Sequence, residues 1–288
     1  MPPAAEPPSA LHRRDPGLRY PADFSVAWHP AMPEFAIAAN AVSMLMPHAE
    51  PYVVKAVRAV ADELPDELAA RARGYIGQEI SHHREHHRFN QLLLTQHPGL
   101  GRVDRWARRT YQWLWNSRSE RFHLAFAAGF ETVAYAAARW TARRRGSLFT
   151  GADPTGARLF QWHLAEEVEH KSVAYDVYYA RHTSRLALAG AMLVSSILLA
   201  WFSVLATLGM LWSTRRIFNP VAHVRLAIWT ISFTFELLPA MGAACLRDHH
   251  PEKMVDPAYF EQWLRELDLE SPATSVAAAR SPALPAGS

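Results

Sequence analysis

Long segments of the chain have apolar residues every three or four positions, and short breaks containing Pro or Gly separate these segments. This spacing places the apolar side chains on one face of a helix. Pro65 stands before a turn that contains Asp66 and Glu67, as at helix starts, and Gly146 follows a segment that begins near Ser119. The period of two that indicates strands is hard to find. The pattern therefore predicts an all-α protein.

The longest helices are expected to form a ferritin-like four-helix bundle with additional apolar helices at the C-terminal end. The connection between the second and third long helices is the longest in this half, as where a crossover joins two antiparallel hairpins. Pro47 and Pro51 predict a kink or a restart near Glu50 in the first helix. The predicted ranges are 32–62, 65–96, 102–116, 119–145, 153–182, 186–212, 221–246 and 257–267.

The predicted division of the chain has four parts. They are a disordered N-terminal tail (1–22), a metal-binding helical bundle (23–182), an apolar helical extension (183–270) and a second disordered tail (271–288). The tails are rich in Pro, Ala and Ser and lack the apolar pattern that a packed core needs.

The segment 186–212 contains no charged residue and is long enough to span a bilayer. The helix predicted at 221–246 carries Arg225, Glu236 and Pro239, so it is a poorer candidate. Two interpretations remain open: both helices pack on the bundle as an extra layer, or 186–212 contacts a membrane. Basic residues flank both ends of this segment, so charge does not determine an orientation.

The composition excludes several kinds of partner and of metal site. The net charge of +3 is spread along the 288 residues, so we expect no nucleic-acid partner. The single cysteine, Cys245, excludes an internal disulfide, a zinc ribbon and an iron–sulfur site. Any metal must then be held by His, Asp and Glu. The first 22 residues lack the apolar core of a signal peptide, which favours the cytoplasm or the cytoplasmic side of the inner membrane.

Two predicted helices each carry a Glu-x-x-His pair. Glu79 and His82 lie in GQEISHHREHHRFN, and Glu167 and His170 lie in WHLAEEVEHKSVAYDVY. Residues three or four apart share a helix face, and His163 extends the second face by one turn. Two such helices, with one Glu from each of two others, form the ligand pattern of di-iron and di-manganese bundles.

Glu50 and Glu131 can supply the two remaining carboxylates. Glu131 has apolar neighbours on nearly all sides, and burying a carboxylate there is costly unless it is paired or binds a metal. An Arg from another helix is the alternative partner. A third Glu-x-x-His match, Glu120 with His123, lies in a polar helix start and is interpreted as incidental.

The four histidines between residues 82 and 87 cannot all bind metal. His83 and His87 lie about 100° round the helix from His82 and His86, so we expect them at the periphery. His86 is expected to orient a ligand by a hydrogen bond, although it could itself be a ligand. Asp176 is a candidate acceptor that orients a ligand imidazole, with an ordinary salt bridge as an equal alternative.

At these residues the sequence resembles a bacterial family described as predicted metal-dependent hydrolases. The likeness covers about residues 23–268 and rests on the Pro47–Glu50 turn, the Glu131 helix and the two Glu-x-x-His segments. The motif order is also similar to the di-iron p-aminobenzoate N-oxygenases, which have an additional His at the position of His163. These resemblances imply a ligand set of Glu50, Glu79, His82, Glu131, His163, Glu167 and His170.

The leading hypothesis is O2 activation by two iron ions to oxidise a small or apolar organic substrate, with manganese or zinc as alternative metals. Two-metal hydrolysis is the alternative, and non-enzymatic metal binding is a third hypothesis. If 186–212 meets a membrane, a lipid-like substrate fits. An electron donor, if one is used, leaves no mark in the sequence.

Overall fold

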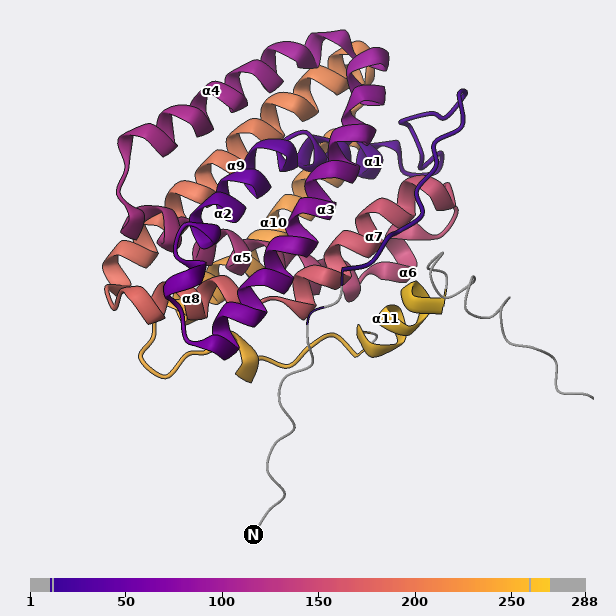
Figure 1. The fold of residues 1–288 in the computed structure, drawn as a ribbon. Helices are drawn as coiled ribbons and strands as arrows, with labels where there is room; N and C mark the ends of the chain where they lie inside the picture. Colours follow the sequence, from indigo (N-terminus) through magenta and orange to yellow (C-terminus); the bar gives the residue numbers. More distant parts are fainter. Residues whose placement is uncertain (1–10, 12, 259, 270–288) are drawn as a thin grey trace, which may run out of the picture.

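The computed structural model describes residues 11, 13–258 and 260–269, which form helices and contain no strand (Figure 1). The all-α prediction is therefore confirmed. The remaining residues, which include half of the predicted tail 1–22 and all of the predicted tail 271–288, lie outside the described part. The main helices are α1 (Pro33–Ser43), α2 (Met46–Arg58), α3 (Asp66–Gln96), α4 (Gly101–Ser117), α5 (Glu120–Ala142), α7 (Pro154–Glu169), α8 (Val173–Arg181), α9 (Arg185–Ser213) and α10 (Pro220–Ala244).

Shorter elements complete the chain. They are α6 (Arg145–Phe149), α11 (Phe260–Leu269) and four 3-10 turns, η1 (Ala61–Glu63), η2 (Pro98–Leu100), η3 (Arg216–Phe218) and η4 (Pro251–Lys253).

The first predicted helix, 32–62, is two helices. The chain breaks at Met44 and Leu45, ahead of the prolines that were expected to cause the kink. Pro47 lies in the first turn of α2, where its missing N–H group would have no partner in the helix. Pro51 lies inside α2, directly after Glu50, so the helix continues through the proline.

The predicted helix 153–182 is also divided, into α7 and α8. Asp153 caps α7, and its carboxylate accepts hydrogen bonds from the backbone N–H groups of Thr155 and Gly156. α7 ends at Glu169, and the turn before α8 contains His170. The break in the helix therefore falls at a predicted metal ligand.

Residues 13–22, which the sequence assigned to a disordered tail, pack on α3 and α7. Arg14 is 8% exposed and forms an ion pair with Glu169, and Leu18 lies in the core. Arg13 donates a hydrogen bond to Ser81 on α3. The sequence did not predict these contacts, because a Pro-rich composition does not reveal ion pairs with residues far along the chain.

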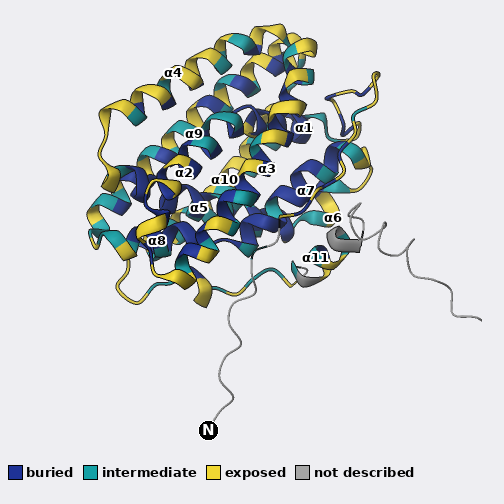
Figure 2. Cartoon of the chain, viewed as in Figure 1, coloured by how far each residue is buried: buried dark blue, intermediate teal, exposed yellow. Residues whose placement is uncertain are grey.

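α5 lies at the centre of the molecule, in contact with α2, α7 and α8 and also with α9 and α10. Alanines along α5 allow close approach, and Gly129 is required where α9 crosses. A Cβ atom on Gly129 would lie 2.5 Å from the Cα atom of Met192. Buried residues face inward from the surrounding helices, while the outer sides of α4 and α10 are exposed (Figure 2).

α9 and α10 pack against α5 and α1 as an extra layer. Leu188, Ala191 and Phe202 of α9 belong to the same core cluster as α2, α3 and α5. The predicted segments 23–182 and 183–270 thus share a core. By length and composition both helices could cross a membrane, with mean hydropathies of 2.1 for α9 and 1.4 for α10.

Candidate metal centre

All seven predicted ligands lie between α2, α3, α5 and α7, and none is more than 8% exposed. They form two groups, and the donor atoms within each group lie within 4.8 Å of one another. The first group is Glu50, His82 and His163, and the second is Glu79, Glu131, Glu167 and His170.

Glu79 and Glu167 join the two groups. One oxygen of Glu167 lies 2.6 Å from His163 Nε2 of the first group, and the other lies 3.2 Å from His170 Nε2 of the second. Glu79 Oε1 lies 3.2 Å from His170 Nε2 and 3.6 Å from His82 Nδ1. The seven residues therefore form one continuous cluster.

Hydrogen bonding determines which nitrogen of His82 faces the cluster. His82 Nε2 lies 2.9 Å from Glu166 Oε2, and an ionised carboxylate only accepts hydrogen bonds. The proton is therefore on Nε2, and the lone pair is on Nδ1. This Nδ1 atom has no hydrogen-bond partner among the described residues. A carboxylate that holds the far nitrogen of a ligand imidazole is typical of metal sites.

The same reasoning applies to His170. Gln78 Nε2 donates to Glu169, so Gln78 Oε1 is the end of the amide that accepts. It accepts from His170 Nδ1 at 2.9 Å. The lone pair of His170 is then on Nε2, which faces Glu79, Glu131 and Glu167.

A chain of hydrogen bonds orients His163 as well. Asn90 Nδ2 donates to the Ser43 carbonyl, so Asn90 Oδ1 accepts from the Ser43 hydroxyl. Ser43 Oγ therefore accepts from His86 Nδ1, and His86 Nε2 accepts from His163 Nδ1 at 2.6 Å. This leaves the lone pair of His163 on Nε2, 2.6 Å from Glu167 Oε1.

The donor atoms of the cluster fit a metal. When these imidazoles are neutral, three lone pairs face carboxylate oxygens, and either a proton or a metal ion between them makes that arrangement favourable. Five carboxylate oxygens of the seven predicted ligands have no hydrogen-bond donor among the described residues: both of Glu50, both of Glu79 and Oε2 of Glu131. Buried polar atoms are normally paired, so these oxygens could hold metal ions.

Glu131 has no arginine partner in the described part of the chain. Tyr75 instead donates a 2.6 Å hydrogen bond to Glu131 Oε1, which leaves Oε2 directed at the cluster. The ring of Tyr75 also packs edge-on against His170. The alternative of an arginine-satisfied carboxylate therefore does not describe this residue.

Burial and the mutual repulsion of the carboxylates shift their titration. Burial and Glu167 raise the pKa of Glu131 to about 8, and burial and Glu79 raise the pKa of Glu50 well above its usual range. Burial alone would lower the pKa of His82, but Glu166 and Glu79 outweigh it and raise that pKa. Without a metal, protons therefore occupy the cluster near neutral pH.

Metal affinity is expected to rise between pH 6 and pH 8, with release of protons on binding. A metal ligand must be deprotonated, and Glu131 is protonated below its pKa of about 8 in the absence of a metal. Titration of Mn²⁺ into weakly buffered protein with an indicator dye would measure the protons that metal binding releases. The Glu131→Gln variant should release fewer protons than the wild type. A metal affinity that does not change with pH would contradict the assignment of Glu131 as a ligand that loses a proton.

The residues that support the ligands were not predicted from the sequence. Arg14 lies 3.5 Å from Glu166, the partner of His82, and 2.7 Å from Glu169, the partner of Gln78. Gln78, adjacent to Glu79, also belongs to this network. The only signal in the sequence was the position of Glu166 and Gln78 directly beside predicted ligands in mainly buried helices.

His86 hydrogen-bonds to His163 rather than joining either ligand group. His83 and His87 line a cavity outside the cluster, between α2, α3 and α4. Asp176 contacts Arg71 and His250, so the structure has the salt bridge rather than a contact with a ligand imidazole.

The incidental Glu-x-x-His match lies outside the cluster. His123 accepts from or donates to Tyr52 at 2.6 Å, and Glu120 lies near Arg181 and His182. Neither residue contacts a predicted ligand.

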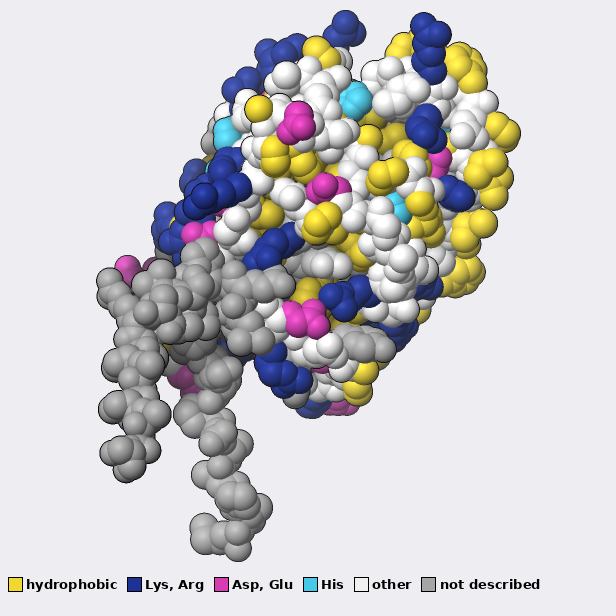
Figure 3. Space-filling view, turned by 90° about the vertical axis from the view of Figure 1, so that its right-hand side faces the viewer, with side chains coloured by type: hydrophobic (Ala, Val, Ile, Leu, Met, Phe, Trp, Pro, Cys, Tyr) yellow, Lys and Arg dark blue, Asp and Glu magenta, His cyan; other side chains and the backbone are white. Residues whose placement is uncertain are grey.

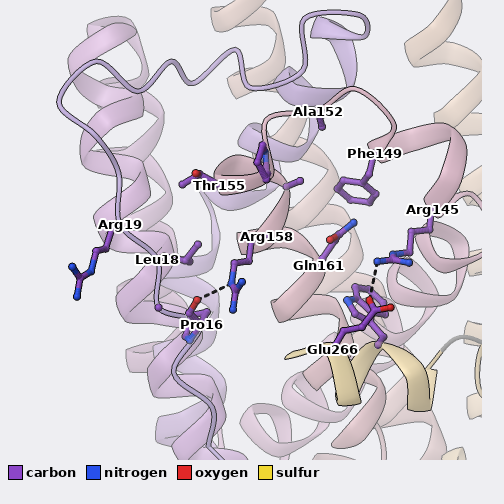
Figure 4. Close-up of a pocket in the computed structure, with 14 residues that line it drawn as sticks. Pro16, Leu18, Arg19, Arg145, Phe149, Ala152, Thr155, Arg158, Gln161 and Glu266 are labelled. Atoms are coloured by element: carbon purple, nitrogen blue, oxygen red, sulfur yellow. Dashed lines mark hydrogen bonds and ion pairs between the residues drawn. The ribbon is translucent and has the colours of Figure 1, made fainter. Parts of the chain in front are cut away.

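Among the described residues, two of the surface cavities contain none of the seven ligands in their lining. One, of about 610 Å³, lies beside α7 under the N-terminal segment and α11 (Figure 4). Arg158 and Gln161 point into it from α7, and Arg145 closes one side with Glu266. The second has about 510 Å³. The metal cluster is thus enclosed by the helices that supply it.

Comparison with known families places this geometry in context. The family model described as predicted metal-dependent hydrolase matches residues 12–254, which is most of the chain. No curated protein and no solved structure matches the chain. The match spans all four helices that supply the ligands and extends through α9 and α10. The chain therefore belongs to the predicted metal-dependent hydrolase family.

Proposed function

We propose that this protein is a metalloenzyme with two divalent metal ions bound by the seven buried residues. One ion is assigned to Glu50, His82 and His163, and the other to Glu79, Glu131, Glu167 and His170. The observation that carries the proposal is the set of five buried carboxylate oxygens without donors, opposed by three imidazole lone pairs. Nitrogen and oxygen donors without thiolate suit iron or manganese and also accept zinc.

The helical arrangement that we propose for this centre is of the ferritin-like type. α2 and α5 each contribute one glutamate, and α3 and the α7 segment each contribute a Glu-x-x-His pair. This order is that of carboxylate-bridged dinuclear bundles, in which one long connection joins the two halves. α4 lies in the connection between α3 and α5.

The reaction that we place first is hydrolysis of a small organic substrate, because the family description names it. Bound divalent ions would supply Lewis acidity and lower the pKa of water. The chain orients His82 through Glu166, His170 through Gln78 and Glu131 through Tyr75. Hydrogen bonds from such partners keep ligand geometry constant during turnover.

Oxidation by O2 at a di-iron centre is the second candidate, and the enclosure of the cluster favours it. None of the seven ligands is more than 8% exposed, and a dry interior suits a small reactant such as O2. The position of His163 four residues before Glu167 matches the N-oxygenase pattern. This function would need an electron donor and would act on a small or lipid-like organic substrate.

One experiment separates the candidates. The protein would be loaded with Fe²⁺ without oxygen and with Mn²⁺ or Zn²⁺ in parallel, then assayed for O2 consumption and for hydrolysis of p-nitrophenyl esters and phosphates. Metal-dependent hydrolysis that Glu167→Gln abolishes would support the first candidate. Consumption of O2 by the iron form alone would support the second, and binding of metal with neither activity would leave a non-enzymatic metal protein.

A further inference from the structure

Both α9 and α10 have an apolar outer side. Large side chains project from it at helical spacing and are between 49% and 77% exposed. Representative members, which define the apolar face, are Ile197, Trp201 and Val204 of α9 and Ile228, Ile231 and Phe235 of α10. In Figure 1, α9 and α10 lie behind the other helices. In Figure 3, which is turned by 90°, hydrophobic side chains gather along the right-hand edge of the molecule.

Charged groups on these helices are directed away from the apolar face. α9 has no charged residue after Arg185. The two charges of α10 are turned to the bundle, since Arg225 lies 3.1 Å from Glu34 and Glu236 lies 2.7 Å from Arg143. A surface of this kind on a soluble protein marks a site of contact with another apolar phase.

α4 borders the apolar face and supplies positive charge. Trp106 of α4 packs edge-on against Trp201 and is 51% exposed. Arg102, Arg105 and Arg109 lie on the exposed side of the same helix and form no ion pair with any residue that the structure describes. A helix with Trp and Arg on its surface is typical of the membrane interface, where the basic groups meet anionic lipid head groups.

We propose that this protein docks on the surface of a bilayer containing anionic lipid, with α9 and α10 lying in the membrane plane and α4 at the head groups. The unpaired arginines beside the apolar face favour lipid over a second copy of the chain, which would have to neutralise them. The inference is independent of the reaction proposed above. The inference goes beyond the proposed reaction, because it identifies a membrane partner and an orientation on that membrane.

The packing of α9 favours an in-plane arrangement over a spanning one. One face of α9 is buried against α5 and α1, so a bilayer around α9 would also enclose the bundle. α3 in that bundle exposes the side chains of Arg84 and Arg88 by about half. Charged residues in the hydrocarbon are costly, so the bundle remains in water and only the apolar face inserts.

Vesicle flotation with the full chain tests the partner. Binding to vesicles with one third phosphatidylglycerol should exceed binding to pure phosphatidylcholine at least tenfold and weaken with salt. The pair Ile228→Glu and Ile231→Glu should abolish binding. Ile80→Glu on α3, which is 39% exposed, is the matched control and should bind normally. Arg102→Gln with Arg109→Gln should remove the lipid preference.

Depth measurement tests the orientation. A fluorophore sensitive to polarity would be attached at position 197 in one Cys245→Ser variant and at position 208 in another. The two positions lie about 16 Å apart along α9. Equal depths in vesicles support the in-plane arrangement, whereas a label at 197 much deeper than one at 208 indicates a span and overturns it. Failure to bind vesicles, together with a concentration-dependent dimer in light scattering, would assign the apolar face to a second copy.

Discussion

Glu167→Gln is expected to reduce the metal content from about two ions per chain to less than one. Glu167 is the carboxylate that lies closest to both groups, 2.6 Å from His163 and 3.2 Å from His170. A neutral amide at this position removes the negative charge between the two ions and offers one oxygen in place of two. Elemental analysis of protein loaded with Fe²⁺ or Mn²⁺ and freed of excess metal would measure the change.

Glu34→Gln is the matched control for this variant. Glu34 is 1% exposed, as buried as Glu167, but it pairs with Arg216 and Arg225 far from the cluster. Its replacement is expected to lower the melting temperature and leave the metal content unchanged. Retention of two ions by Glu167→Gln would remove this residue from the ligand set.

Metal loading is expected to raise the melting temperature by roughly 15 °C or more. Two sites at a thousandfold excess over their dissociation constants would each contribute about 4 kcal/mol, and 1 kcal/mol shifts a domain of this size by about 2–4 °C. Burial and repulsion among the carboxylates raise the pKa of Glu50 and Glu131, and bound ions would relieve that repulsion. Calorimetry with and without a chelator would measure the difference, and equal melting temperatures would contradict a structural link to metal.

Glu50→Met separates metal binding from folding. Both carboxylate oxygens of Glu50 lack donors, so methionine should increase the free energy of unfolding of metal-free protein by about 1–3 kcal/mol. The same variant should gain less from added metal than the wild type does. A Glu50→Met protein that is less stable than the wild type when both are metal-free would show that Glu50 has a partner other than a metal.

The prediction of the helices from the sequence depended on local signals. Pro65 and the acids after it mark the start of α3, and the apolar periodicity of 186–212 matches α9 within a residue at each end. The break before α2 lies just ahead of Pro47, one of the two prolines that predicted an interruption of the first helix. The break at His170 has no Pro or Gly beside it, so the sequence predicted a continuous helix there.

The residues of the candidate site were likewise predicted only where a local signal in the sequence marks them. Spacing of three or four along a helix placed Glu79 with His82 and Glu167 with His170, because the helical repeat alone brings those side chains to one face. The sequence could also single out Glu131, since a carboxylate among apolar neighbours needs a partner. The residues that support the ligands from outside the cluster could not be predicted. Arg14 and Glu169, for example, form an ion pair although 155 positions separate them in the sequence.

The sequence by itself therefore determined the helical class, the main segments and the two Glu-x-x-His pairs, whose members follow helical periodicity. The tertiary structure alone decided that the seven residues form one cluster, that Glu166 and Gln78 direct two of its imidazoles, and that Asp176 belongs to a separate salt bridge. It also decided that the charges of α10 turn inward and leave its outer side apolar. The reason is physical: periodicity acts within one helix, whereas the partner of a buried charge depends on how distant helices pack.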